Sequence, residues 1–308
     1  MDVTAGGFFQ PAAKLNGPKG GGLIPNDSFY VSDLDGTLLT NEGQLSDYTR
    51  QTLTRLLKAG LPFTAASARS VVSMREVLKD LPLAFPVIEH NGAFISDFKT
   101  GRHEIINAIE PEIVEGLMRL IHDRRQVPVL SAFDGERDRV YYSQIINDGM
   151  ALYLKGRQKQ NDPRLRQVEK FEPVLGQAIV CMTVIGKREE LKPFEKVFQD
   201  QYGLRIETHC FEDLYSPGWH WLTLHDRRAT KDQAIRILQE KQGLQDKELV
   251  VFGDHINDIK MFKIAGRSIA VENAQPELKR HAHQVIEANE KDSVARFLEE
   301  DWEKRRRT

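Results

Sequence analysis

The sequence predicts an α/β fold in which a parallel-sheet core is interrupted by an inserted α+β domain. In the first part of the chain and again near its end, short apolar runs of β type alternate with helical segments, which is typical of a parallel sheet. From about Ser96 the pattern changes to hairpin-like pieces with interleaved helices, which favours an α+β sheet covered by helices. The length of 308 residues suits about two domains.

The expected core comprises residues 28–96 and 223–308. Its first elements are a strand at Phe29, a helix over 47–59 capped by Ser46, a strand at Phe63, a helix over 71–79 and a strand over 87–89. The core resumes at Thr223, adds a strand over 269–271 and ends in a helix from Ser293. Residues 1–27 are rich in Gly and Pro and lack the basic start and apolar centre of a secretory signal, so we expect a flexible leader.

The expected inserted domain comprises residues 97–222. Turn signals at Thr100-Gly101 and Asp134-Gly135 lie between apolar runs. Helices are expected near 112–124, 147–158 and 188–202, with a strong strand over 178–184.

The segment Asp33-Leu34-Asp35-Gly36-Thr37 places two acids directly after a buried strand. Ligands of open α/β sheets lie at that edge. A carboxylate can attack a phosphate ester if cations neutralise the charge, so Asp33 is the candidate nucleophile. Asp35 would protonate the leaving oxygen and then activate water. Gly36 lets the backbone turn beside the phosphate, and N–H groups of the turn, including that of Leu34, can face its oxygens.

Three later segments offer complementary groups. Ser67 follows a second strand and supplies a hydroxyl, while Lys231 opens a helix and supplies a positive charge for the phosphoryl group. The segment Gly253-Asp254-His255-Ile256-Asn257-Asp258 follows the strand at 249–252. Asp33 and Asp254 fit a Mg²⁺ site, because this ion prefers carboxylate oxygens. Asn257 and Asp258 would contact phosphate or orient Lys231.

Simpler interpretations exist for each piece alone. Asp and Gly favour turns, Ser67 alone suits a helix cap, and Lys231 alone suits a solvated helix position. A calcium-binding EF-hand loop counted from Asp33 needs Gly at position six and Glu at position twelve, but these are Leu38 and Gln44. The conjunction of all four segments at strand ends and helix starts favours phosphoryl transfer.

These four segments together resemble the haloacid-dehalogenase superfamily, and their spacing is similar to that of its type IIB, Cof-like phosphatases. Asn91-Gly92-Ala93 and the segment 270–274 add to the resemblance, which covers about residues 28–300. It implies a Rossmann-like core, Mg²⁺ dependence and an inserted α/β cap domain. The implied substrates are small phosphorylated metabolites such as sugar phosphates or phosphorylated cofactors.

The resemblance also implies residue roles. Mg²⁺ would be bound by Asp33, the Asp35 carbonyl and Asp254. Phosphate would be contacted by Leu34, Ser67, Ala68, Lys231 and Asn257, and supporting positions would be Thr37, Arg69 and Asp258. The second motif reads Ala-Ser-Ala-Arg where such proteins often have Thr-Gly-Arg. Ala68 therefore stands at the glycine position, where the implied phosphate contact is made by the backbone.

A cap that closes over phosphate excludes water and reads the leaving group. Candidate specificity loops are 134–137 and 215–220. Trp219 and Trp221 alternate along a strand, for which core packing is the default. His90 is as consistent with a structural role as with a place near the site, and His255 is expected to be a solvent-facing loop residue.

Composition limits the partners. A net charge of −2 gives no overall attraction to nucleic acid or anionic membranes, and no stretch reaches about 18 apolar residues. Cys181 and Cys210 have no metal or redox spacing, which favours a reduced, cytoplasmic protein. We expect a monomer or small homo-oligomer.

The sequence therefore predicts a Mg²⁺-dependent phosphatase of a small phosphorylated metabolite. Two alternatives remain at this level. A phosphomutase shares Asp33 and Asp35 but returns the phosphoryl group to a sugar. A non-catalytic regulator would retain the site and bind a metabolite without turning it over.

Overall fold

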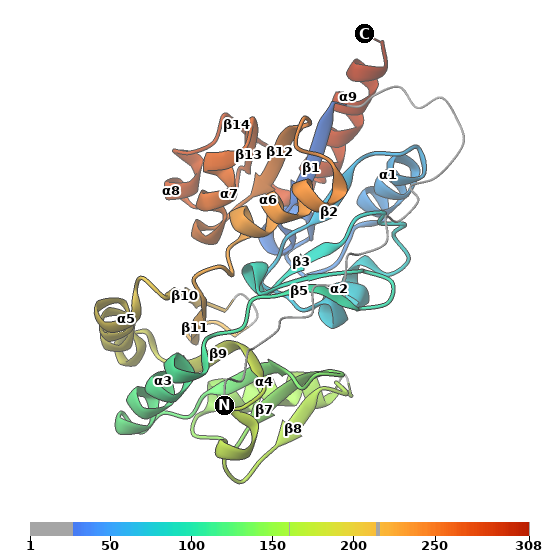
Figure 1. Ribbon diagram of the computed structural model, residues 1–308. Coiled ribbons are helices and arrows are strands. Elements are labelled where there is room, and N and C mark those ends of the chain that lie inside the picture. Colours follow the sequence, from blue (N-terminus) through green and yellow to red (C-terminus); the bar gives the residue numbers. More distant parts are fainter. Residues whose placement is uncertain (1–26, 160, 214–215, 308) are drawn as a thin grey trace.

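The computed structural model describes residues 27–159, 161–213 and 216–307 (Figure 1). The expected leader therefore lies, apart from residue 27, outside the described residues. Within these ranges no helix is both long and apolar enough to cross a membrane.

A five-stranded parallel sheet forms the core, as predicted. Its order is β14-β13-β12-β1-β2, and every pair of neighbours is parallel. The strands are β1 (Ser28–Ser32), β2 (Phe63–Ala65), β12 (Glu248–Gly253), β13 (Arg267–Val271) and β14 (Gln284–Ile286). A parallel bridge from Ala66 to Ile88 links β2 to β3 (Val87–Glu89).

Along the chain, helices alternate with these strands, as the sequence pattern predicted. They are α1 (Asp47–Lys58), α2 (Val71–Leu78), α6 (Lys231–Gln242), α7 (Ile259–Ile264), α8 (Pro276–Lys279) and α9 (Ser293–Arg307). Ser46 and Ser70 cap α1 and α2, because each hydroxyl accepts a hydrogen bond from the backbone N–H three residues on. α1 packs against α9, and α6 against α7.

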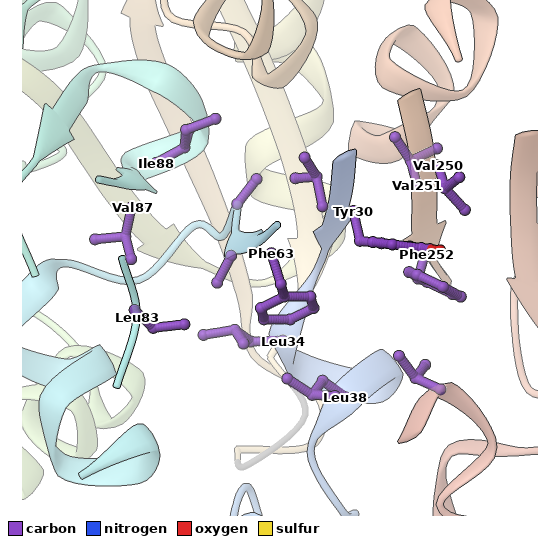
Figure 2. Packing of buried hydrophobic residues seen from close by; sticks show 14 of the residues in the cluster. Tyr30, Leu34, Leu38, Phe63, Leu83, Val87, Ile88, Val250, Val251 and Phe252 are labelled. Carbon is purple, nitrogen blue, oxygen red and sulfur yellow. The ribbon is translucent and has the colours of Figure 1, made fainter. Parts of the chain in front are cut away.

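The central strand β1 is buried along its whole length. Figure 2 shows its Tyr30 among apolar side chains of neighbouring strands, including Phe63, Val251 and Phe252. Leu34, directly after Asp33, is fully buried in the same cluster. Burying a side chain of this size contributes about 1.5–3 kcal/mol. Leu34 therefore anchors the backbone between the two acids to the core.

The inserted domain is built on a six-stranded sheet of order β10-β11-β9-β6-β7-β8. Neighbouring strands are antiparallel except β7 and β8. The strands are β6 (Val129–Phe133), β7 (Asp138–Tyr142), β8 (Leu165–Gln167), β9 (Ala178–Gly186), β10 (Ile206–Glu212) and β11 (His220–Asp226). The helices are α3 (Pro111–Asp123), α4 (Asp148–Lys159) and α5 (Arg188–Tyr202), so the α+β mixture is confirmed.

Strand pairing shifts both expected limits of this insertion. β11 spans residue 223 and pairs with β9 and β10, so the expected return to the core at Thr223 is wrong. At the other limit, β4 (Phe94–Ser96) pairs with both β3 and β5 (His103–Ile106) in a three-stranded antiparallel sheet on the core side. The chain crosses between the domains near residues 107–109, where Asn107 still bonds to Ala93 and Ile109 already bonds to Ile179.

Candidate active site

The two strands that carry the first and last motifs are neighbours in the sheet. Ser32 pairs with Phe252, and the Asp33 N–H donates to the Phe252 carbonyl at 3.0 Å. Because the strands are parallel, Asp33 and Asp254 both follow strand ends at one sheet edge. Carboxylate oxygens of Asp33, Asp254 and Asp258 lie within 4.8 Å of one another. The three acids are therefore brought together as the motif spacing predicted.

Lys231 lies at the start of α6 and is 1% exposed. Its Nζ donates to Asp33 Oδ1 and to Asp258 Oδ1, each at 2.7 Å. Burial acts to lower the pKa of Lys231, but the two carboxylates outweigh burial and raise it. The lysine is therefore a permanent cation beside Asp33.

Asp258 is fully buried and uses both carboxylate oxygens. Oδ1 accepts a hydrogen bond from Lys231 Nζ, and Oδ2 accepts hydrogen bonds from the backbone N–H groups of Asp254 and His255 at 3.1 Å each. A Cβ on Gly253 would lie 2.6 Å from Oδ2, so that position requires glycine. Asp258 thus fixes the loop that carries Asp254 and positions Lys231.

The turn after Asp33 closes against Asp254. Thr37 Oγ1 donates to Asp254 Oδ1 at 2.8 Å. Gly36 has φ +73°, and a Cβ there would lie 2.5 Å from Asp254 Oδ2. The glycine therefore permits both the left-handed turn and the close approach of the carboxylate.

Negative charge exceeds positive charge in this cluster. Three carboxylates surround a single buried ammonium. The pKa of Asp254 is raised by burial and by the charges of Asp33 and Asp258. Burial also raises the pKa of Asp33, and Lys231 only partly opposes the shift. A cation would relieve this repulsion, and the oxygen donors of Asp33 and Asp254 fit a hard divalent ion such as Mg²⁺.

Asp35 forms a bidentate ion pair. Arg69 Nε donates to Asp35 Oδ2 at 2.7 Å and Arg69 Nη2 to Oδ1 at 2.6 Å. Both side chains are partly exposed, at 26% and 18%. The pair joins the first motif to the second, and Arg69 also reaches Ser73.

Ser67, Ala68 and Asn257 meet around Asn91. Ser67 is buried, its Oγ accepts the Arg69 backbone N–H, and its carbonyl accepts the Asn91 N–H. Asn257 Nδ2 donates to Asn91 Oδ1 at 3.0 Å, whereas Asn257 Oδ1 has no partner among the described residues. Ala68 is exposed. Asn91 was expected only as part of the family resemblance and was assigned no contact, although its left-handed φ of 58° marks an unusual turn.

A cavity adjoins these residues. Its core side consists of Ala68, His90 and Asn91, and its opposite side consists of residues from α4, β6, β9, β10 and β11. Neither 134–137 nor the described part of 215–220 lines it, whereas Trp221 does. His90 reaches the cavity, while His255 packs its ring 6.3 Å from that of Phe211.

The comparisons agree with this arrangement. A family model described as haloacid dehalogenase-like hydrolase matches residues 30–298. A Haemophilus influenzae protein named as a putative phosphatase is 27% identical over 273 residues, which cover 88% of this chain and 97% of the relative.

A Bacillus subtilis relative, 5-amino-6-(5-phospho-D-ribitylamino)uracil phosphatase, is 23% identical, with 87% and 95% of the two chains covered. A solved structure of a subclass IIB sugar phosphatase has a TM-score of 0.69 and 20% identity, covering 89% of this chain and 98% of that one. The match to the family model spans most of the sequence. The chain therefore belongs to the haloacid dehalogenase-like hydrolase family, and both the type IIB, Cof-like arrangement and the phosphatase class that its motifs predicted are confirmed.

Proposed function

We propose that this enzyme hydrolyses the phosphate monoester of a small metabolite, with Mg²⁺, through an aspartyl-phosphate at Asp33. Two observations carry the proposal. Lys231 Nζ bridges the buried carboxylates of Asp33 and Asp258, and a carboxylate oxygen of Asp254 lies within 4.8 Å of an oxygen of each of these acids. A carboxylate beside a permanent cation can approach an anionic phosphate. The name of the Bacillus subtilis relative, which specifies a small phosphate ester, supports the substrate class.

In the first step an Asp33 carboxylate oxygen attacks phosphorus and the bond to the ester oxygen breaks. Asp35 donates its proton to the departing oxygen. In the second step Asp35 removes a proton from water, which attacks the phosphorus and releases phosphate from Asp33. Asp35 faces Arg69 in this structure, so the ion pair has to open before Asp35 can reach the leaving oxygen.

The remaining groups hold phosphate. Lys231 neutralises charge, the Ser67 hydroxyl and Asn257 amide donate, and the backbone N–H groups at Leu34 and Ala68 face phosphate oxygens. Mg²⁺ would be held by Asp33, the Asp35 carbonyl and Asp254, and it would supply charge neutralisation and alignment for the phosphate. Thr37, Arg69 and Asp258 keep the reacting acids and Lys231 in place through the hydrogen bonds described above.

The test is Asp33→Asn, which keeps the shape of the side chain but removes the nucleophilic charge. Phosphate release from a panel of monoesters with Mg²⁺ should fall by roughly 10⁴-fold or more. Asp80→Asn, at an exposed position, is the matched control and should keep full activity. Normal turnover by a folded Asp33→Asn protein would refute the role of Asp33.

The two alternatives give different results with the unmodified enzyme. A phosphomutase needs a bisphosphate activator, so phosphate release without one supports hydrolysis. A non-catalytic regulator would bind esters with Mg²⁺ without releasing phosphate from any of them.

A further inference from the structure

The turn η2 (His90–Gly92), which follows β3, has an unusual backbone. Three successive residues have positive φ: His90 at 46°, Asn91 at 58° and Gly92 at 111°. Residues other than glycine visit the left-handed region as isolated positions, because the Cβ atom crowds the backbone there. Two of them in succession therefore store strain. Such strain persists only where the surroundings fix the backbone, and it occurs most often at functional sites.

Contacts on two sides fix this turn. The backbone N–H of Asn91 donates to the Ser67 carbonyl of the second motif at 3.0 Å. On the other side, Asn107 Nδ2 donates to the Gly92 carbonyl at 2.9 Å. Both bonds use backbone atoms of the turn, so they would form equally well with glycine at position 91. They explain how the strain is held but not why a strained asparagine side chain is present.

The side chain of Asn91 contacts the last motif. It is 3% exposed, and its Oδ1 accepts a hydrogen bond from Asn257 Nδ2 at 3.0 Å. An amide nitrogen carries two hydrogens, so this bond orients the Asn257 amide and leaves its second hydrogen for a phosphate oxygen. If the amide rotated to present its oxygen instead, an anionic phosphate would be repelled.

Asn91 therefore contacts two groups that are assigned to phosphate binding above. Its backbone bonds to Ser67 and its side chain to Asn257. Asparagine suits this position because it tolerates the left-handed region better than most residues and carries an uncharged acceptor. Aspartate tolerates the region as well, but its negative charge would lie beside the phosphate-binding groups.

We propose that Asn91 is a positioning residue for phosphate: it holds the Ser67 carbonyl and the Asn257 amide in one arrangement, and the strained turn lets it reach both. The proposal rests on the proposed phosphatase function, in which Ser67 and Asn257 contact phosphate. It follows that the Asn91 amide should matter for turnover even in a variant whose backbone strain has been removed.

Two substitutions separate the side chain from the strain. Asn91→Gly removes the amide and relieves the strain, whereas Asn91→Ala removes the amide and keeps the strain. Asn91→Gly should therefore have the higher urea midpoint of the two. Both should lose kcat/KM for p-nitrophenyl phosphate with Mg²⁺ by about 10- to 100-fold, the scale seen when a group that orients a binding residue is removed.

Asn161 offers a matched control, because it has φ 51° at an exposed position of the inserted domain. Asn161→Gly and Asn161→Ala should show the same order of urea midpoints and full activity. If activity at position 91 followed stability instead, with Asn91→Gly close to the unmodified rate, the Asn91 side chain would have no positioning role and the proposal would fail.

A double-mutant cycle tests whether Asn91 acts through Asn257. Asn257→Ala removes the oriented amide itself, so adding Asn91→Gly to Asn257→Ala should lower kcat/KM by no more than about threefold further. Independent effects would multiply. A further loss of about 10- to 100-fold in the Asn257→Ala background would therefore overturn the proposal.

The outcomes separate this proposal from the phosphatase function. Phosphate release by the unmodified enzyme supports the phosphatase whatever the Asn91 variants do, so a failure of the positioning role leaves that function standing. Absence of phosphate release from every ester of a broad panel, with Mg²⁺ present, would overturn both.

Discussion

At the scale of single residues, the site depends on a lysine that makes two equal contacts. Lys231 is 2.7 Å from Asp33 and from Asp258, and all three side chains are buried. Asp258 cannot turn away, because two backbone N–H groups hold its other oxygen. Asp33, the proposed nucleophile, is therefore oriented by a chain of fixed contacts, and Asp35, the proposed proton-transfer residue, is not part of that chain.

Asp35→Asn should separate the two chemical steps. Asp33 remains, so it can still attack an ester whose leaving group needs no proton, such as p-nitrophenyl phosphate. Hydrolysis of the aspartyl-phosphate should slow by roughly 10²–10⁴-fold because water loses its base. Rapid mixing should show a burst of up to one p-nitrophenolate per enzyme followed by a slow phase. Steady turnover at the unmodified rate, without a burst, would contradict the role of Asp35.

The motif residues could be predicted from sequence because their chemistry is local. Asp33, Asp35 and Gly36 follow one buried strand, and Asp254 follows another. The side chains that line the cavity could not be predicted in this way. Trp221 and Thr223 occupy alternate positions of an ordinary-looking strand, and only the docking of the inserted domain decides which face of that strand meets the core.

At the scale of elements, the sheet to which β11 belongs could not be predicted from its local sequence, for a related reason. The run at Thr223 precedes the helix of Lys231, as a core strand would, yet β11 pairs within the inserted domain. Pairing with β9 joins residues 34 to 42 positions apart in the chain, and the apolar pattern of β11 does not specify those partners. The core strands β1 and β12 were predictable because buried parallel strands are continuously apolar.

The short turn η2 (His90–Gly92) packs on the start of α6 and gives an element-scale prediction. Gly92 has φ +111°, and a Cβ there would lie 2.5 Å from the carbonyl oxygen of Thr230, the residue before Lys231. Gly92→Ala should therefore cost about 2 kcal/mol or more in the free energy of unfolding and lower kcat by displacing Lys231.

Urea unfolding and phosphate release measure the two effects. Gly135→Ala is the matched control, because Gly135 has φ +104° but nothing within 4 Å of the added carbon. It should show the backbone penalty of about 1 kcal/mol without loss of activity. Equal effects of the two substitutions would show that the contact with Thr230 is unimportant.

At the scale of the whole molecule, buried polar contacts join the inserted domain to the core. Arg164 of the inserted domain donates to Ser70, which caps α2. His103 of β5 contacts Asp138 of β7 at 2.7 Å through Nε2, while its Nδ1 lies 2.7 Å from Ser96 Oγ and 3.6 Å from the buried Glu89. The His103 ring stacks on Phe94 at 3.9 Å. These contacts set the position of the cavity wall over the motifs.

The His103 contacts should make stability depend on pH. Burial acts to lower the pKa of His103, but Asp138 and Glu89 outweigh it and raise the pKa to about 9. Since the folded pKa exceeds the unfolded value near 6.5, the stabilisation is complete below about pH 6.5 and is lost as pH rises through 9. In urea unfolding, His103→Asn should be less stable than the unmodified protein by on the order of 2 kcal/mol at pH 6.5. A gap that does not shrink by pH 9.5 would show that His103 carries no charge in the fold.

The acidic cluster makes a second prediction for the whole molecule, because its repulsion opposes folding when no cation is bound. The pKa values of Asp33 and Asp254 are raised in the folded protein. The contribution of these two acids to the stability of the metal-free protein should therefore be most favourable at acid pH, where both are protonated, and should fall as both ionise. Mg²⁺ binds the ionised, folded form and should reverse the loss. At a concentration of 100 times its Kd it should add about 2.7 kcal/mol at neutral pH, visible as a rise in Tm after chelator treatment.

Asp254→Asn separates this effect from general salt effects. The amide oxygen can still accept from Thr37, while one of the mutually repelling charges is gone. Metal-free Asp254→Asn should therefore be at least as stable as the unmodified metal-free protein at pH 7, yet show neither a Mg²⁺-dependent rise in Tm nor phosphatase activity. Asp80→Asn should retain both. If Asp254→Asn kept the full Mg²⁺ response in Tm, the ion would have to bind elsewhere, and the grouping of Asp33 with Asp254 would have another cause.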